Sequence, residues 1–205
     1  GQIGQHFLEI ALQNDHQVTA IVRREGALTI THPNLEVVVV DYQNEAHLTK
    51  VIKGQDAIVS TLGPSLKSGR KVTSLPIRDA HEMILRVMEQ YDVKRFITIG
   101  TPSIQSFQDK KQMATILPSL MPQILFPPAY AEMKGIEKLL KASKVDWTVI
   151  RIINPNLKSN GNGYTTSLGD TKAGFSVSRK NVAQCMYDAI KKSEWIEKMP
   201  IVFNN

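Results

Sequence analysis

Apolar residues along this chain alternate between two kinds of pattern. Residues 2–14 place large apolar side chains at helical spacing, and residues 17–23 form a short run rich in β-branched residues. The same alternation continues to the C-terminus. Strand patterns cover 17–23, 35–42, 55–63, 93–101, 145–152 and 199–205, and helix patterns cover 2–14, 44–54, 76–92, 129–143 and 179–193. Strands that alternate with helices predict βαβ units and therefore a parallel sheet with helices on both faces.

The order of these segments predicts an α/β fold with a Rossmann-type, doubly wound sheet, because crossovers between parallel strands are right-handed. The continuous apolar run at 35–42 is typical of a strand covered on both faces. We see no internal repeat and no linker, so we predict one NAD(P)-binding domain over 1–205. Two insertions, at 102–129 and 154–174, follow later strands, where ligands bind in such folds.

Composition narrows the function classes. A chain of 205 residues with 42% hydrophobic and 21% charged residues can bury a core, which argues against disorder. The net charge of +6 is spread without a long basic run, so we do not expect a nucleic-acid partner. No apolar run approaches the roughly 20 residues of a membrane span, and a single cysteine fits a reducing cytoplasm. The histidines are scattered without metal-ligand spacing, so no metal site is predicted.

Glycines open the chain. Gly1 and Gly4 are spaced G-x-x-G immediately before the first helix pattern. In a dinucleotide-binding turn, glycines let backbone N–H groups approach a pyrophosphate at the helix N-terminus. The strand and first glycine of such a turn are absent, so we expect roughly 6–12 further residues upstream that supply the central strand of a 3-2-1-4-5-6 sheet. A chance pair of glycines is the alternative.

Two arginines follow the next strand pattern. Arg23 and Arg24 lie nineteen and twenty residues after Gly4, where a cofactor without a ribose phosphate usually meets an acidic residue. A guanidinium instead pairs with a 2′-phosphate, which favours NADP(H) over NAD(H). The alternative is two solvated arginines at a strand end.

Two later strand ends offer further contacts to a cofactor. Asp41 follows the run of valines and is placed to bond an adenine amino group beside Tyr42. Residues 61–64 read "TLGP", so Leu62 and Gly63 offer a flat backbone against the adenosine.

A tyrosine and a lysine are spaced for acid–base chemistry. Tyr130 and Lys134 lie four apart in "YAEMK", on one face of a helix. An ammonium stabilises a nearby phenolate, so that the phenol can exchange a proton with a carbonyl oxygen while hydride moves. Thr101, or as second choice Ser103, supplies a hydroxyl that orients the substrate. An ordinary surface pair is the alternative.

These segments carry a resemblance to a known family. "GQIGQHFLEIALQNDHQVTAIVRR", "DAIVSTLG", "KRFITIGT" and "YAEMKGIEKLLKASKVDWTVIRI" resemble the short-chain dehydrogenase/reductase superfamily. The nearest branch is its atypical, NmrA-like members, which include flavin-reductase-like and biliverdin-reductase-B-like proteins. The likeness spans nearly the whole chain, and "KASKVDWTVIR" is its most specific part.

The resemblance assigns roles residue by residue. It makes Gly1 and Gly4 the second and third glycines of the turn, and Arg23 and Arg24 the ligands of a 2′-phosphate. It makes Tyr130 and Lys134 the catalytic pair, with Lys134 also on the nicotinamide ribose and Thr101 near the catalytic serine.

The chain departs from the family pattern at two places. Threonine replaces the serine, and the usual Arg-Pro after the sixth strand reads Arg151-Ile152, with Pro155 displaced. Many NmrA-like relatives lack the tyrosine, and some only sense the cofactor. The resemblance therefore supports cofactor binding more firmly than catalysis.

A hydrophobic segment rich in proline, 113–130, precedes and includes the tyrosine. Its prolines argue against a simple long helix. It is interpreted as a flap packed on the core, a mobile lip over the nicotinamide, or a contact in a homodimer. Its large apolar residues are Met113, Ile116, Leu117, Leu120, Met121, Ile124, Leu125 and Phe126.

We therefore expect an NADPH-dependent reductase acting on a small flavin, quinone or carbonyl acceptor. The rival hypothesis is a non-catalytic NADP sensor that acts through a protein partner. A third, a sugar-nucleotide epimerase or dehydratase, normally has a larger C-terminal substrate domain, for which the residues after 154 leave little room.

Overall fold

The computed structural model describes residues 1–65, 71–156 and 162–205, and gives the backbone alone at 114 and 117–121. Its main sheet has five strands in the order β3-β4-β5-β9-β7, and β1 and β2 form a separate parallel pair. All pairs in the main sheet are parallel except β7 with β9. The strands are β1 (Val18–Val22), β2 (Leu35–Val39), β3 (Ala57–Ser60), β4 (Arg95–Gly100), β5 (Asp146–Ile152), β7 (Tyr164–Ser167) and β9 (Ile201–Asn204), with β6 (Pro155–Asn156) and β8 (Val177–Ser178) as a small third pair.

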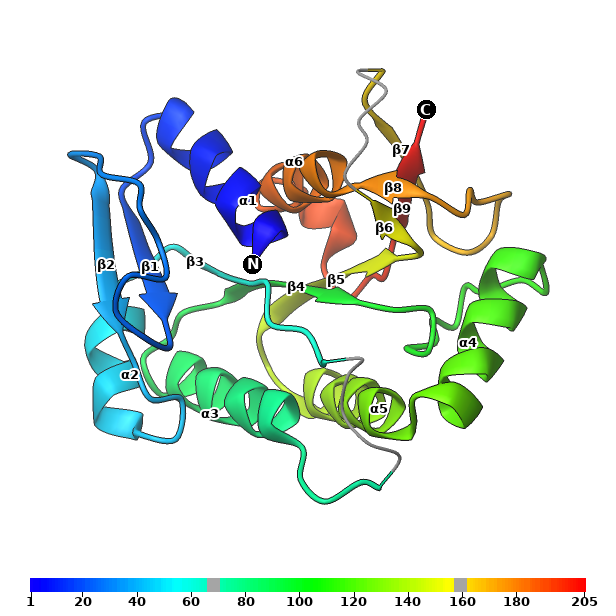
Figure 1. Ribbon diagram of the computed structural model, residues 1–205, viewed down its shortest axis with the longest axis horizontal. Helices are drawn as coiled ribbons and strands as arrows, with labels where there is room; N and C mark the ends of the chain where they lie inside the picture. Colours follow the sequence, from blue (N-terminus) through cyan, green and yellow to red (C-terminus); the bar gives the residue numbers. More distant parts are fainter. Residues whose placement is uncertain (66–70, 157–161) are drawn as a thin grey trace.

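Helices lie on both sides of these strands, as a doubly wound fold requires (Figure 1). One layer contains α1 (Gln2–Gln13) and α6 (Arg179–Ala189), which pack against each other. The other contains α2 (Glu45–Ile52), α3 (Pro76–Gln90) and α5 (Pro127–Ala142), with α4 (Met113–Leu125) beside α5. A short 3-10 helix, η1 (Ser193–Trp195), precedes β9.

The core follows from the alternation of side chains along each strand. On β4, Phe96 packs in the cluster with α3 and α5, whereas Ile97 packs in the cluster with α6. On β5, Val149 and Ile150 divide in the same way. Both faces of these central strands are therefore covered by helices, and most of their residues are buried.

Strand pairing stops between β1 and β3. β1 pairs with β2 and β3 pairs with β4, and neither of these two pairs is joined to the other among the described strands. In the predicted 3-2-1-4-5-6 order, strand 1 is the one expected upstream of Gly1, and it would lie between the strands that are labelled β1 and β3 here. The interruption therefore lies at the place where the sequence predicts a missing central strand.

The prediction that the run at 35–42 is covered on both faces is wrong. Val38 and Val40 pack in the core against α2, but Val37 and Val39 are 43% and 45% exposed. β2 lies on the outer side of β1 (Figure 1), and its side chains alternate between the two faces. The apolar run therefore has one buried face and one exposed face.

The first insertion is more regular than the sequence predicts. Residues 113–125 form α4, although this helix includes Pro118 and Pro122. The side chains of Gln112 and Thr115 form a capping box at its N-terminus, a signal that was missed. The chain breaks at Phe126, and α5 begins at Pro127, where a proline needs no N–H partner. The side chains of Leu117, Leu120 and Met121 lie outside the described residues.

Candidate functional site

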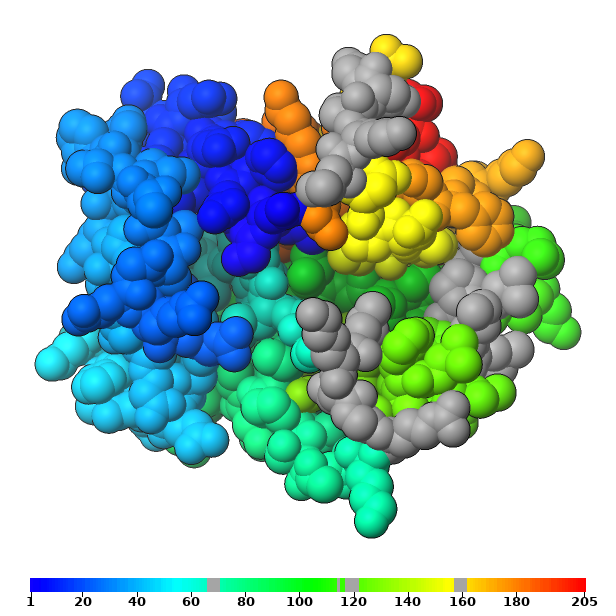
Figure 2. Space-filling view, viewed as in Figure 1, coloured from blue at the N-terminus to red at the C-terminus, as the bar shows by residue number. Residues whose placement is uncertain are grey.

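The N-terminal end of α1 lines a cavity of about 300 Å³. Gly1 and Gly4 contribute to its wall together with Thr61, which follows β3, and Arg179, which opens α6. The surface is hollowed where α1 meets the segment after β3 (Figure 2). A Cβ at position 4 would lie 2.8 Å from the Thr61 hydroxyl, so glycine allows this close approach. The structure thus brings both predicted glycines to one cavity, beside two residues that the sequence analysis missed.

Arg23 and Arg24 lie at the carboxyl end of β1, where both are exposed. Burial raises the pKa of Tyr42, and the positive charge of Arg23 opposes that rise, which places the guanidinium near the phenol. Arg23, which follows β1, and Tyr42, which follows β2, are therefore within electrostatic reach of each other.

Asp41 is exposed and forms a local turn. Its carboxylate accepts a hydrogen bond from the Gln43 N–H at 3.0 Å, and its carbonyl accepts one from the Asn44 N–H at 3.0 Å. Asn44 in turn caps α2 by accepting from the His47 N–H. Asp41 therefore has a structural role in this turn besides its predicted contact with adenine.

A second cavity, of about 230 Å³, opens beside Tyr42. Tyr42 and its neighbour Gln43 form one side of this cavity, and residues of α3 form the other. The lining residues from α3 are Asp79, Glu82, Met83 and Arg86. Tyr42, which lies next to the predicted adenine ligand Asp41, therefore lines a cavity between the end of β2 and α3.

The turn that contains Leu62 and Gly63 is fixed by a buried histidine. His81 of α3 approaches the hydroxyl of Thr98 at 3.0 Å and that of Ser60 at 3.3 Å, and the Ser60 hydroxyl accepts from the Leu62 N–H. Burial lowers the pKa of His81 to about 4. The neutral ring donates from Nδ1 to the Ile77 carbonyl, so Nε2 accepts from the hydroxyls, an assignment made from the partners.

The three predicted catalytic residues lie at the ends of β4 and α5. Thr101 directly follows β4, and its hydroxyl accepts from the Ser103 N–H at 3.4 Å. Tyr130 is half-buried in the first turns of α5, one turn before Lys134. Among the described hydrogen bonds, none joins the Tyr130 hydroxyl to Lys134 or to Thr101.

Lys134 has another partner. Its ammonium pairs with the carboxylate of Glu137, which also binds the ammonium of Lys141 at 2.6 Å. Glu137 is nearly buried, so this charge is held in place by the fold. Two ammonium groups share one carboxylate, and one positive charge therefore remains on this face of α5.

Glu132 joins α5 to α3. Its buried carboxylate accepts hydrogen bonds from the N–H groups of Ile77 at 3.1 Å and Arg78 at 2.6 Å. The residue before α3 is Leu75, whose side chain cannot cap a helix, so Glu132 provides the cap from another helix. The sequence shows that α3 starts at a proline without a capping residue, which indicates that its first N–H groups need an acceptor from elsewhere. It does not indicate that Glu132 is this acceptor.

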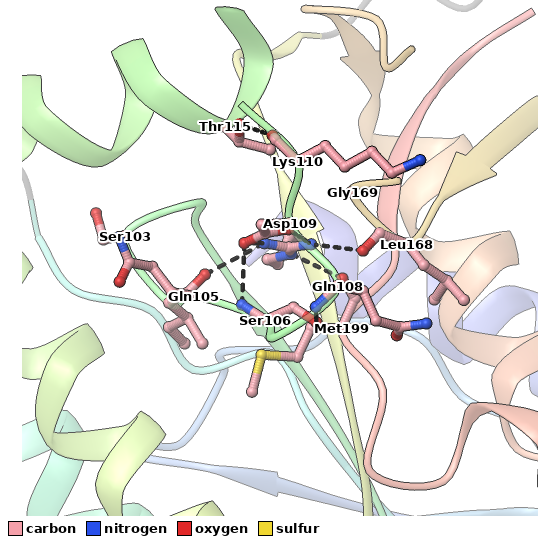
Figure 3. Close-up of polar contacts among 12 residues, drawn as sticks. Ser103, Gln105, Ser106, Gln108, Asp109, Lys110, Thr115, Leu168, Gly169 and Met199 are labelled. Carbon is pink, nitrogen blue, oxygen red and sulfur yellow. Dashed lines mark hydrogen bonds and ion pairs between the residues drawn. The ribbon is translucent and has the colours of Figure 1, made fainter. Parts of the chain in front are cut away.

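Arg151 connects the two insertions. It is fully buried, and its guanidinium binds the carboxylate of Asp109 through two contacts of 2.7 and 2.8 Å. Its Nε donates to the Met199 carbonyl at 2.7 Å. Asp109 lies where the first insertion meets the second, and there the Lys110 N–H donates to the Gly169 carbonyl (Figure 3). Arg151, the arginine that precedes Ile152 where the family pattern has proline, thus holds the two insertions together.

In the described part of the chain, no group of three or more His, Cys, Asp or Glu side chains is arranged to hold a metal ion. Burial raises the pKa of the Cys185 thiol, so this cysteine stays protonated. No helix among the same residues has the length and apolar character to cross a membrane.

Comparisons with known proteins agree with this geometry. Residues 1–193 match a protein family described as NAD(P)H-binding. The chain is also similar to the uncharacterised sugar epimerase YhfK of Bacillus subtilis (strain 168). The identity is 26% over 189 residues, which are 90% of this chain and 81% of that protein.

Solved structures share the fold at low identity. A short-chain dehydrogenase/reductase from Veillonella parvula DSM 2008 in complex with NADP has a TM-score of 0.79 at 15% identity, over 100% of this chain and 90% of the other. A Rossmann-fold NAD(P)-binding family protein from Shigella flexneri has a TM-score of 0.70 at 21% identity, over 100% and 89%. The predicted Rossmann-type fold is confirmed.

Proposed function

This chain belongs to the NAD(P)H-binding family, and we propose that it is an NADPH-dependent reductase that transfers hydride to a small flat acceptor such as a flavin, a quinone or a carbonyl compound. Membership agrees with the resemblance to short-chain dehydrogenases/reductases and supports a nicotinamide cofactor of the NADP(H) type. The observation that carries the proposal is the cavity at the start of α1, which combines two glycines with the Thr61 hydroxyl and the Arg179 guanidinium.

The residues of this cavity fit a dinucleotide. Gly1 has no side chain to cap α1, so the first-turn N–H groups are available to an anion. The missing Cβ of Gly4 keeps Thr61 close to this turn. When bound, the reduced nicotinamide supplies the hydride.

The preference for NADPH rests on Arg23 and Arg24. Arg23 lies near Tyr42, so a guanidinium and an aromatic ring are both present where the adenosine ribose is expected. The neighbour from Veillonella parvula was solved with NADP, which also supports this choice.

In this proposal, two residues of α5 and Thr101 carry out the acid–base chemistry. Tyr130 donates a proton to a carbonyl oxygen, and Thr101 orients the acceptor. Lys134 reaches the ribose by leaving Glu137, whose charge Lys141 continues to balance.

The acceptor is expected to be apolar and flat. The C-terminal part of α4 leads directly to Tyr130 and exposes large apolar side chains, of which Ile124 is 71% exposed. Exposed apolar surface next to a cofactor suits a flavin or a quinone ring.

Substitution of the two arginines tests the cofactor assignment. In the Arg23→Ala/Arg24→Ala variant, NADPH affinity should fall by about tenfold or more and NADH affinity should change little, because hydrogen bonds to charged groups contribute about 1.5–3 kcal/mol. If this variant keeps the wild-type preference for NADPH, the assignment is wrong.

Substitution of Tyr130 tests the proton donor. Tyr130→Phe should abolish most carbonyl reduction and spare quinone or flavin reduction, which needs no alkoxide protonation. A variant with full activity on carbonyl compounds would remove Tyr130 as the donor and leave the reductase proposal intact.

The similarity to a sugar epimerase favours a second candidate. An epimerase would interconvert sugar nucleotides without net consumption of NADPH. The non-catalytic sensor would bind NADPH tightly and show no turnover with any acceptor or sugar nucleotide. Assays of sugar-nucleotide isomerisation and of NADPH oxidation on the same protein distinguish the reductase, the epimerase and the non-catalytic sensor.

A further inference from the structure

The wall of the α1 cavity includes a cationic side chain from the last helix. Arg179 is the first residue of α6, and it lines the same cavity as Gly1, Gly4 and Thr61. Its Nη1 donates a hydrogen bond to the side-chain oxygen of Gln2, in the first turn of α1. The start of α6 and the start of α1 therefore meet at one cavity, although they come from opposite ends of the chain.

The fold holds the backbone of Arg179 firmly. Ser178 caps α6 by accepting from the Asn181 N–H at 3.1 Å. The Asn181 side chain donates to the Gly163 carbonyl at 2.7 Å and to the Asn204 side chain at 2.9 Å, which ties α6 to the end of β9. The guanidinium can therefore move by rotating its own side chain while the helix stays in place.

The chemistry of the cavity matches a diphosphate. A pyrophosphate carries negative charge on oxygens that accept from backbone N–H groups at a helix start. A guanidinium adds a full positive charge and paired donors in a planar fork. The amide of Gln2 is a neutral acceptor, so an anion in the cavity competes well for Arg179.

We propose that Arg179 binds the pyrophosphate of the cofactor, together with the first turn of α1, and leaves Gln2 when it does so. This inference rests on the cofactor site of the proposed function, but it does not depend on which acceptor is reduced. Arg23 and Arg24 contact the part that distinguishes NADPH from NADH, whereas Arg179 contacts a part that both share. Arg179 therefore determines affinity, and the other two arginines determine preference.

The test compares two neighbouring residues of the same charge. Arg179→Gln should weaken binding of NADPH and of NADH by the same factor, about tenfold or more. Lys180 is exposed and does not line the cavity, so Lys180→Gln, which removes the same charge, should change both affinities by less than about twofold. Arg179→Lys keeps the charge and should retain part of the affinity, and thermal unfolding of each variant checks that it is folded.

A ligand without a pyrophosphate locates the contact. Adenosine 2′-monophosphate should bind Arg179→Gln as it binds the wild type, and should bind Arg23→Ala/Arg24→Ala more weakly. Equal losses in Arg179→Gln and Lys180→Gln, or a loss of adenosine 2′-monophosphate binding in Arg179→Gln, would overturn the inference. Absence of NADPH binding to the wild type would overturn it as well. Binding without reduction of any acceptor would overturn only the proposed reductase.

Discussion

Arg151 and Asp109 form an ion pair in which two nitrogens of a fully buried guanidinium meet the two oxygens of one carboxylate. Arg151 ends the buried part of β5, and Asp109 belongs to the first insertion. The pair therefore fixes a loop of the first insertion to the carboxyl end of the sheet. This relationship ties the loop that carries Asp109 to the folded core.

Removal of the carboxylate should be strongly destabilising. Asp109→Ala leaves the buried Arg151 charge without its counter-ion, which typically costs about 3–5 kcal/mol. The free energy of unfolding in urea measures this loss. Asp170 is exposed in the second insertion, and Asp170→Ala should change stability by less than about 0.5 kcal/mol. A loss below about 1 kcal/mol in Asp109→Ala would contradict the role given to the pair.

Gly169 should tolerate no side chain. Its φ is +96°, and a Cβ there would lie 2.0 Å from the Asp109 carboxylate. Gly26 also has a positive φ, of +69°, but a Cβ at that position would meet no atom within 4 Å. Gly169→Ala should therefore destabilise the protein by clearly more than Gly26→Ala, for which the strain alone is about 1 kcal/mol. Equal losses in thermal or urea unfolding would show that the contact with Asp109 does not matter.

The cap that Glu132 provides should contribute to stability. Glu132→Ala removes the acceptor of two N–H groups at the start of α3 and should cost about 2 kcal/mol in urea unfolding. Glu132→Gln keeps an acceptor oxygen and should lose less. The exposed Glu25, changed to Ala, is the control for the loss of one negative charge. Equal stability of the Ala and Gln variants would argue against the cap.

Acid should destabilise the fold through His81. Its pKa falls from 6.5 to about 4 on folding, so below pH 6.5 the unfolded chain binds a proton that the folded chain refuses. This contribution to stability is fully present above pH 6.5 and is lost as the pH falls toward 4, by up to about 3 kcal/mol.

Unfolding in urea at several pH values measures this contribution. His81→Gln should show a smaller loss of stability on acidification than the wild type, and the exposed His47→Gln variant should behave like the wild type. Parallel pH profiles for His81→Gln and the wild type would exclude the mechanism.

Most of the strands and helices could be predicted from the sequence because their signals are local, but β6, β7 and β8 were not predicted. Apolar periodicity placed β4, β5 and α3 within two residues of their observed bounds. The helix at 113–125 was not predicted because its prolines argue strongly against a helix, whereas Gln112 is only a weak indication of a helix N-terminus. The exposure of Val37 depends on which strand is outermost, which no local pattern encodes.

The site was predictable only where one segment carries it. Gly1 and Gly4 belong to one motif, and Arg23 lies at a known distance from them. Arg179 and Glu132 act on helices far away in the sequence, so their roles emerge only when tertiary contacts are known. The pairing of Lys134 with Glu137 is local, but Glu137 also has Lys141 at helical spacing on α5.

The proposed function is that the protein oxidises NADPH and transfers its hydride to a small acceptor. The most direct measurement is the rate of NADPH and of NADH oxidation by the purified protein, with a panel of quinones, flavins and carbonyl compounds. The proposed function predicts that at least one acceptor is reduced, and faster with NADPH than with NADH. NADPH that binds but is oxidised by no acceptor in the panel, or NADH that serves equally well, would contradict the claim.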